Sequence, residues 1–314
     1  MTALLADIGG TNARFAMLHD GVIGPPLILS VAAFACVEDA IALALDHVAP
    51  GAVVTQAVLA LAGPVPRDPG DTVIRLTNAT WGFSIPSIAA RFGFARVRLM
   101  NDFLALAHAL PHLGSADLLP IGGGVAEPNA PMLVLGPGTG LGVAALVGTT
   151  AVPTEGGHIG LAPADAEQEA VIAALRLRAG RAGAEEALSG RGLAALHAIF
   201  AERGRANVPI RDAGAVLASA DTCPVAHAAR RMFLDLLAGY AGDMALAWGA
   251  RGGVFIAGGI MPRLAAGMDP ARFRRGFEAK PPMKRYLAGI PVNLVVHPAP
   301  AFTGLATLAT MPEA

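Results

Sequence analysis

One plan occurs twice along this chain: an apolar run, a glycine-rich turn and a second apolar run. The first copy covers residues 3–18 and turns at Gly9 and Gly10, and the second covers 132–146 and turns at 136–142. Short apolar runs that end in glycine are typical of buried strands. Each copy therefore predicts a β-hairpin, and two hairpin-led units predict a chain built from two similar halves.

The remaining apolar and periodic segments predict an alternation of strands and helices. Further strands are expected at 27–31, 57–62, 72–77 (as an edge strand), 97–100, 254–257 and 292–296. Helices are expected at 38–48, 86–92, 103–110, 167–178, 192–202, 213–220, 225–248 and 302–309, and a loop at 122–131. Strands that alternate with helices indicate an α/β architecture. With 314 residues, the chain is long enough for about two domains.

Hydrophobic residues make up 54% of the chain and charged residues only 15%, so a membrane protein has to be considered. The longest uncharged stretch, residues 128–154, contains the glycines of the second turn and is not expected to form a spanning helix. The first residues have no basic segment, and Asp7 lies where a signal peptide would be apolar. We therefore expect no membrane insertion.

Net charge and cysteine content limit the binding partners and the cellular compartment that we expect for this chain. The net charge of −1 gives no excess of basic residues for binding nucleic acid. The two cysteines, Cys36 and Cys223, suit a reducing compartment better than a disulfide framework. Both are expected to be small buried apolar side chains.

The glycine turns are candidates for binding phosphate. Glycine pairs leave backbone N–H groups free and let an anion approach closely, and a third pair, Gly258 and Gly259, follows the strand at 254–257. Three such turns favour one nucleotide site made from separate loops, although each alone is also typical of an ordinary β-turn. The second turn also permits a dinucleotide-binding fold if a helix follows it. A Walker A loop is excluded, because no glycine precedes either lysine.

Two aspartates follow predicted strands. Asp102, next to Asn101, comes after the strand at 97–100 and begins a helix, so it is either a helix cap or a general base. The second interpretation is favoured by the place where α/β proteins bind ligands, the carboxyl ends of strands. A carboxylate there can accept the proton of a substrate hydroxyl. Asp7, at the end of the first strand, suits a cation, held directly or through water.

Glu155 and His158 surround a glycine pair and can both form hydrogen bonds with neighbouring sugar hydroxyls. The alternative for this segment is an exposed turn. A metal site is disfavoured, because no second ligand pair lies at helical spacing. Glu185 by itself predicts only a solvated charge near a helix end.

In order along the chain, these segments resemble bacterial glucokinases of the hexokinase/actin-like ATPase superfamily. The matching segments are 6–14, 62–65, 76–78 with Trp81, 83–85, 101–103, 135–142, 155–158, and 256–260 with 262–263. They extend over nearly the whole chain. The resemblance is to the non-ROK type, because the cysteine-rich zinc motif of the related kinase/repressor group requires more than two isolated cysteines. We predict no zinc.

The resemblance implies specific roles for residues of this chain. It implies that Asp102 is the catalytic base in the ATP-dependent phosphorylation of D-glucose to glucose 6-phosphate, the first step of glycolysis. The implied sugar-binding residues are Asn78, Asn101, Asp102, Glu155, His158 and Glu185. The implied ATP-binding residues are Ala6, Asp7, Ile8, Gly9, Gly10, Thr11, Asn12, Gly138, Thr139, Gly140, Gly258 and Gly259. Asp7 is also expected to hold Mg²⁺, through water.

The resemblance further implies a two-domain actin-like ATPase (ribonuclease H-like) α/β fold, with sugar and ATP in the cleft between the domains. The small domain is expected at 1–110 plus 299–314 and the large domain at 111–298. A cytoplasmic homodimer is expected, without a nucleic-acid or membrane partner. No helix-turn-helix segment precedes the first strand, which disfavours a DNA-binding relative.

The sequence departs from the family pattern at one position, and three other functions remain as alternatives. Arg191 lies where relatives are expected to have proline, in the segment Ser-Gly-Arg-Gly-Leu at 189–193, and this bears on the contact that Glu185 makes. The rivals are a kinase of another hexose or hexosamine, a catalytically silent sugar-responsive regulator, and a dinucleotide-dependent oxidoreductase. The presence of Asp102 with both glycine motifs argues against the silent regulator.

Overall fold

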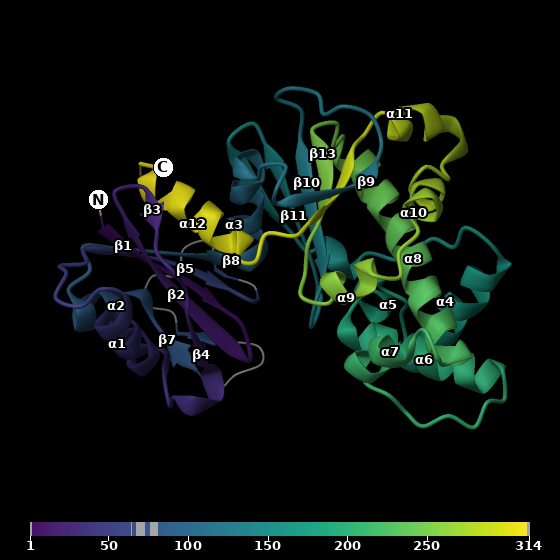
Figure 1. Cartoon of the computed structure of the whole chain (residues 1–314), viewed down its shortest axis with the longest axis horizontal. Coiled ribbons are helices and arrows are strands. Elements are labelled where there is room, and N and C mark those ends of the chain that lie inside the picture. Colours follow the sequence, from purple (N-terminus) through teal and green to yellow (C-terminus); the bar gives the residue numbers. More distant parts are fainter. Residues whose placement is uncertain (1, 64, 67–72, 76–80, 313–314) are drawn as a thin grey trace. The chain divides into compact units, whose positions relative to one another are not determined.

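The computed structural model describes residues 2–63, 65–66, 73–75 and 81–312. The chain forms two compact units: one lies within Met1–Leu113 and Pro298–Ala314, and the other is Gly114–His297. Each unit contains a mixed sheet flanked by helices (Figure 1). The predicted α/β class is therefore confirmed.

The first unit is built on a six-stranded sheet that begins with the predicted hairpin. Its strands are β1 (Thr2–Ile8), β2 (Asn12–His19), β3 (Val22–Ile23), β4 (Leu27–Ser30), β5 (Gln56–Leu61) and β8 (Arg96–Asn101). They follow the order β3-β2-β1-β5-β8, and β4 pairs with β2. Strands β1, β5 and β8 are parallel, whereas β2 is antiparallel to β1. The carboxyl ends of the three parallel strands β1, β5 and β8 consequently lie at the same edge of the sheet.

The edge strand predicted at 72–77 does not belong to this six-stranded sheet. Within the described residues it is β6 (Ile74–Arg75), which pairs with β7 (Gly82–Phe83) in a separate two-stranded sheet. Residues 72, 76 and 77 of the predicted strand lie outside the described ranges.

Helices cover both faces of the first sheet. Successive side chains of a strand point to opposite faces, so a strand such as β1 contributes to two apolar clusters. Leu4 and Ile8 of β1 join one apolar cluster with residues of α1 (Val37–Val48) and α2 (Ile85–Phe92). Leu5 joins another with residues of α3 (Asp102–Ala109) and α12 (Pro300–Thr310). Figure 1 shows α12 beside α3, so the carboxyl-terminal helix completes the core of the amino-terminal unit.

The second unit repeats the pairing plan of the first. Its strands are β9 (Leu118–Gly122), β10 (Met132–Pro137), β11 (Leu141–Val147), β12 (Thr150–Thr154), β13 (Gly253–Ile256) and β14 (Val292–Val295). The order is β12-β11-β10-β13-β14-β9, in which β10, β13 and β14 are parallel. As in the first unit, an antiparallel hairpin leads into parallel strands. The prediction of two similar halves is thereby confirmed.

Two strands of this sheet were not predicted. Strand β9 ends at Gly122, where the predicted loop begins, and β12 contains Pro153. Both form sheet edges and expose several of their side chains. Edge strands of this kind lack the continuous apolar run that identifies a buried strand.

Helices make up most of the remainder of the second unit. They are α4 (Ala166–Ala179), α5 (Ala184–Ala187), α6 (Gly190–Arg203), α7 (Ala213–Ser219), α8 (Pro224–Trp248), α9 (Met261–Ala265), α10 (Pro270–Phe277) and α11 (Lys284–Ala288). The helices predicted at α4, α6, α7 and α8 are confirmed, and α5 and α9–α11 were missed. Helix α8 lies in the core of the unit and packs against α6 and α10. Of the helices that the structure describes, none combines the length and apolar character needed to cross a membrane.

Candidate active site

The first glycine turn joins the two strands of the first hairpin. Ala6, Asp7 and Ile8 end β1, Gly9, Gly10 and Thr11 make the turn, and Asn12 begins β2. The Gly9 amide donates a hydrogen bond to the Asn12 carbonyl oxygen over 3.0 Å. Thr11 and Asn12 are exposed, and the glycines are half-buried. The turn is therefore accessible to a ligand.

Asp7 is paired with a residue on the neighbouring strand. Its Oδ2 atom lies 3.0 Å from Nη1 of Arg14, the residue directly opposite in the β1–β2 register. Burial raises the pKa of Asp7, although the charge of Arg14 and its hydrogen bond act in the opposite direction. Sequence interpretation missed this pairing, but the hairpin contained the signal, because residues 7 and 14 are equally far from the centre of the turn.

Asn101 connects β8 to both the neighbouring loop and the following helix. Its Nδ2 atom donates to the Gly63 carbonyl oxygen over 2.9 Å, and its Oδ1 accepts from the Phe103 amide over 2.8 Å. Asn101 is therefore the residue that caps the amino terminus of α3. Asp102, the first residue of α3, also accepts from the Phe103 amide, over 2.9 Å.

The Asp102 carboxyl group has an unusual affinity for protons. Burial, followed by the charge of Asp7, raises the pKa of Asp102 to about 7. Hydrogen bonds from the backbone and Asn101 only partly offset this rise. A carboxyl group whose pKa is near neutrality is suited to accepting a proton during catalysis and releasing it afterwards.

The second glycine turn closes the β10–β11 hairpin. The Gly138 amide donates to the Gly140 carbonyl oxygen over 2.8 Å, and Thr139 between them is exposed. A Cβ atom added to Gly138 would have no heavy atom within 4 Å. The backbone at Gly138 therefore borders open space, as close approach by a ligand requires.

Glu185 contacts this turn directly. Its Oε2 accepts a hydrogen bond from the Leu141 amide over 2.9 Å, and its Oε1 accepts one from Nη2 of Arg191 over 2.6 Å. The Gly190 amide, at the start of α6, donates to the Gly138 carbonyl oxygen over 2.8 Å. The sequence alone predicted a solvated charge for Glu185, yet only 17% of its side chain is exposed.

Two other glycine segments pack against the same hairpin. Gly258, with φ +100°, is so close to the Pro137 carbonyl oxygen that a side chain there would overlap it. Gly157 has the same relation to the carbonyl oxygen of Leu141. The second and third predicted phosphate turns and the predicted sugar-binding turn are thus brought together within the second unit.

Glu155 and His158 lie on either side of Gly156 and Gly157 and point into solvent. Their side chains are 76% and 64% exposed, and His158 Nε2 lies 3.7 Å from Glu155 Oε2. Gly259, the second glycine of the third turn, is exposed and has open space where a side chain would be.

Among the described residues, no three histidine, cysteine, aspartate or glutamate side chains form a group that could hold a metal ion. The predicted sugar ligand Asn78 lies outside the described residues.

Comparison with known proteins identifies the family. The family model described as glucokinase matches residues 4–312. The chain belongs to the glucokinase family. It is 40% identical to the glucokinase of Paramagnetospirillum magneticum over 318 aligned positions, which cover 99% of this chain and 98% of the relative.

Solved glucokinases have the same fold. A glucokinase from an Antarctic psychrotroph superposes with a TM-score of 0.88 at 35% identity and covers 99% of each chain. A ROK-family glucokinase from Streptomyces griseus, solved in complex with glucose and AMPPNP, superposes with a TM-score of 0.66 at 20% identity. That alignment covers 98% of this chain and 99% of the other, and it supports the fold alone. The family resemblance seen in the sequence is confirmed.

Proposed function

We propose that this member of the glucokinase family transfers the γ-phosphoryl group of ATP to the 6-hydroxyl of D-glucose. The observation that carries the proposal is Asp102, a carboxyl group at the carboxyl end of β8 whose pKa is raised to about 7. The family match supports glucose and ATP as the substrates, because relatives that align with at least 96% of this chain are glucokinases.

In the proposed reaction Asp102 acts as the general base. As the sugar O6 attacks the γ-phosphorus in line, its proton passes to the Asp102 carboxylate, the bond from phosphorus to the bridging oxygen breaks and ADP leaves. A base whose pKa lies near the working pH is deprotonated often enough to accept the proton and basic enough to hold it. Most of the acceleration in such transfers comes from positioning and electrostatics.

The remaining polar residues would orient the sugar. Asn101, Glu155, His158 and Glu185 supply amide, carboxylate and imidazole groups that match sugar hydroxyls as donors or acceptors, and Asn78 is proposed with them on the resemblance alone. Asn101 has an independent structural role, because it caps α3 and is bonded to Gly63. We therefore expect its side chain to be fixed before the sugar arrives.

ATP would be held by the backbone of the three glycine turns. The residues proposed for this are Ala6, Asp7, Ile8, Gly9, Gly10, Thr11, Asn12, Gly138, Thr139, Gly140, Gly258 and Gly259. Two observations support the fit: open space beside Gly138 and Gly259, and the positive φ of Gly258. Free backbone N–H groups in turns of this kind bind phosphate oxygens.

Asp7 would hold Mg²⁺ through water. The donor chemistry suits that ion, because Mg²⁺ prefers oxygen ligands and keeps several of its waters. The negative charge of Asp7 already raises the pKa of Asp102, so a cation near this pair would relieve an unfavourable interaction. When bound, the ion would neutralise charge on the phosphate groups.

The larger-scale proposals follow the family resemblance. We propose an actin-like ATPase (ribonuclease H-like) fold with a small domain at 1–110 plus 299–314 and a large domain at 111–298. Sugar and ATP would bind in a cleft between these domains, and closure would keep water from the γ-phosphate. A homodimer in the cytoplasm completes the proposal.

An ADP-release assay over a panel of hexoses and hexosamines tests the function. We expect glucose-dependent ADP release that requires Mg²⁺. The variant Asp102→Asn should lower kcat about 10²–10⁴-fold, the usual share of a general base, while glucose binding measured by calorimetry changes little. Asp46→Asn, at an exposed position of α1, is the control and should leave kcat unchanged.

Near-normal turnover by Asp102→Asn would contradict the role of that residue. A marked preference for a hexosamine would correct the substrate. NAD binding without any sugar-dependent ADP release would instead support the oxidoreductase alternative.

A further inference from the structure

Arg191 lies in the first turn of α6 and joins two carboxylates of the preceding helix. Its Nη2 atom is 2.6 Å from Oε1 of Glu185 and 3.0 Å from Oε1 of Glu186. The Arg191 side chain is 59% exposed, whereas Glu185 is 17% exposed. A mostly exposed cation thus reaches inward to a mostly buried anion.

The other oxygen of Glu185 is held by the glycine turn. Oε2 accepts from the Leu141 amide over 2.9 Å, and a Cβ atom on Gly140 would lie only 2.5 Å from that oxygen. Glycine at position 140 therefore makes room for the carboxylate. With Arg191 on Oε1 and the turn on Oε2, the group is fixed from both sides.

The backbone around Glu185 is also fixed. Its carbonyl oxygen accepts a hydrogen bond from Ser189 Oγ over 2.8 Å, and Ser189 caps α6 through the Gly192 amide over 3.1 Å. Main-chain movement of Glu185 is thus restrained independently of Arg191. Arg191 additionally fixes the orientation of the Glu185 carboxylate. It also offsets the repulsion between Glu185 and the neighbouring carboxylate of Glu186.

We propose that Arg191 is a positioning residue that orients the Glu185 carboxylate for hydrogen bonding to a sugar hydroxyl. The inference rests on the proposed function, in which Glu185 binds the sugar. Each carboxylate oxygen has more than one acceptor site, so the bonds to Arg191 and Leu141 leave capacity for a hydroxyl donor. Preorganisation of this kind strengthens binding, because less freedom is lost when the ligand arrives.

Steady-state kinetics of Arg191→Ala, Arg191→Lys, Glu185→Gln and the double variant Arg191→Ala/Glu185→Gln test the proposal. We expect Arg191→Ala to raise KM for glucose about 3–10-fold, a modest effect because the ion pair is partly solvated. Both kcat and KM for ATP should change less than about twofold. Arg191→Lys should restore most of the affinity, because an ammonium group can replace one charged contact.

The double variant isolates the route through Glu185. If Arg191 acts on the sugar only by orienting Glu185, its removal adds little once Glu185 is already glutamine. Arg203→Ala, at the opposite end of α6 and exposed, is the matched control and should leave KM for glucose unchanged.

The outcomes separate the inference from the function on which it rests. An unchanged KM for glucose in Arg191→Ala, in a preparation with normal kcat, would overturn the inference alone. Fully additive effects in the double variant would also overturn it. Absence of glucose-dependent ADP release by the unmodified protein would overturn the proposed function, and the role of Glu185 with it.

Discussion

At the scale of single residues, Asp7 and Asp102 illustrate how a proposed catalytic arrangement opposes stability. Burial raises the pKa of both carboxyl groups, and the charge of Asp7 raises that of Asp102 further. Arg14 lies 3.0 Å from Asp7 and compensates part of the unfavourable charge there. For Asp102, hydrogen bonds from the backbone and Asn101 partly compensate the charge.

The raised pKa of Asp102 predicts how stability depends on pH. Its ordinary value is 3.8, and the folded protein holds the proton up to about pH 7. Between these values the folded state binds more protons than the unfolded state, so stability falls as pH rises. Asp102→Asn removes this penalty and should raise Tm at pH 8 by at least about 2 °C, with a smaller difference near pH 4.

Thermal melts with EDTA and without sugar or nucleotide measure this difference, and Asp46→Asn supplies the reference for an exposed aspartate. A lower Tm for Asp102→Asn at pH 8 would show that its carboxylate stabilises the fold and would contradict the prediction.

At the scale of elements, glycine determines how closely helices approach. In the first unit a Cβ atom at Gly304 of α12 would overlap the carbonyl oxygen of Ala105 in α3. In the second unit Gly242 of α8 has the same relation to the Phe277 carbonyl oxygen in α10. These contacts are as close as those of the glycine turns, but they lie between packed helices.

Helix α8 contains a matched pair of glycines. Gly242→Ala should destabilise the protein by about 1–3 kcal/mol, because the added methyl group meets a backbone atom that has to move. Gly239→Ala, one turn earlier, meets nothing within 4 Å. It should stabilise the protein by up to about 1 kcal/mol, because alanine favours helix more than glycine does.

Urea unfolding of the two variants measures the difference in the free energy of unfolding. Equal values for Gly239→Ala and Gly242→Ala would mean that α8 and α10 approach less closely than the structure indicates.

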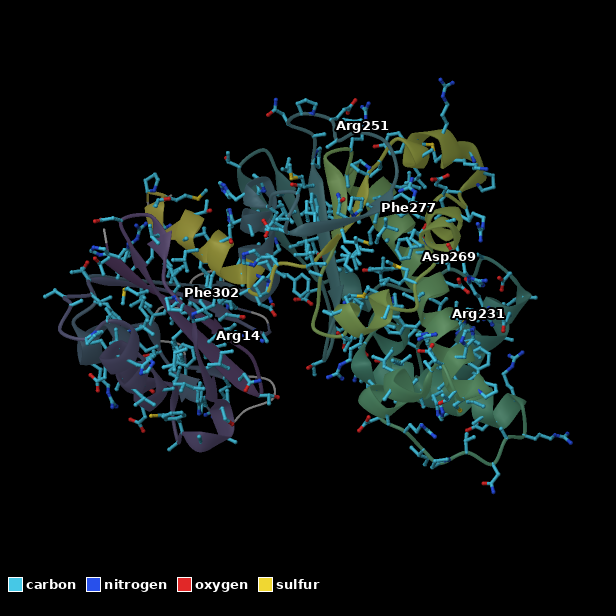
Figure 2. The ribbon with its side chains drawn as sticks, viewed as in Figure 1. Arg14, Arg231, Arg251, Asp269, Phe277 and Phe302 are labelled. Carbon is cyan, nitrogen blue, oxygen red and sulfur yellow. The ribbon has the colours of Figure 1, made fainter. Side chains whose placement is uncertain are left out.

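At the scale of the whole molecule, the two units have separate cores. Phe302 of α12 is 3% exposed and lies in the core of the first unit, and Phe277 of α10 is fully buried in the second (Figure 2). A contiguous segment builds the second unit, whereas the first requires both ends of the chain.

This division predicts local unfolding confined to one unit. Phe302→Ala and Phe277→Ala should each cost about 3–5 kcal/mol in the core that they affect. By hydrogen exchange, Phe302→Ala should speed exchange in β1, β5 and α3, and Phe277→Ala in α8 and β14. Each variant is the control for the other, and equal acceleration along the whole chain by both would indicate one cooperative block.

Local patterns in the sequence predicted most of the fold and part of the candidate site. Both hairpins, the buried strand β5 and the long helices followed from apolar periodicity and from glycine at the turns. Asp102 could be placed at the end of a strand and the head of a helix for the same reason. These features depend on neighbours in sequence, whose spacing directly determines which face is apolar.

Tertiary structure alone decided the features that join distant residues. It placed Glu185 against the Leu141 amide and raised the pKa of Asp102 through burial and the charge of Asp7. It also revealed β9 and β12, whose exposed positions leave no clear apolar pattern. The physical reason is that burial, charge proximity and strand pairing depend on which surfaces meet after the chain has folded, whereas turns and periodicity act between near neighbours.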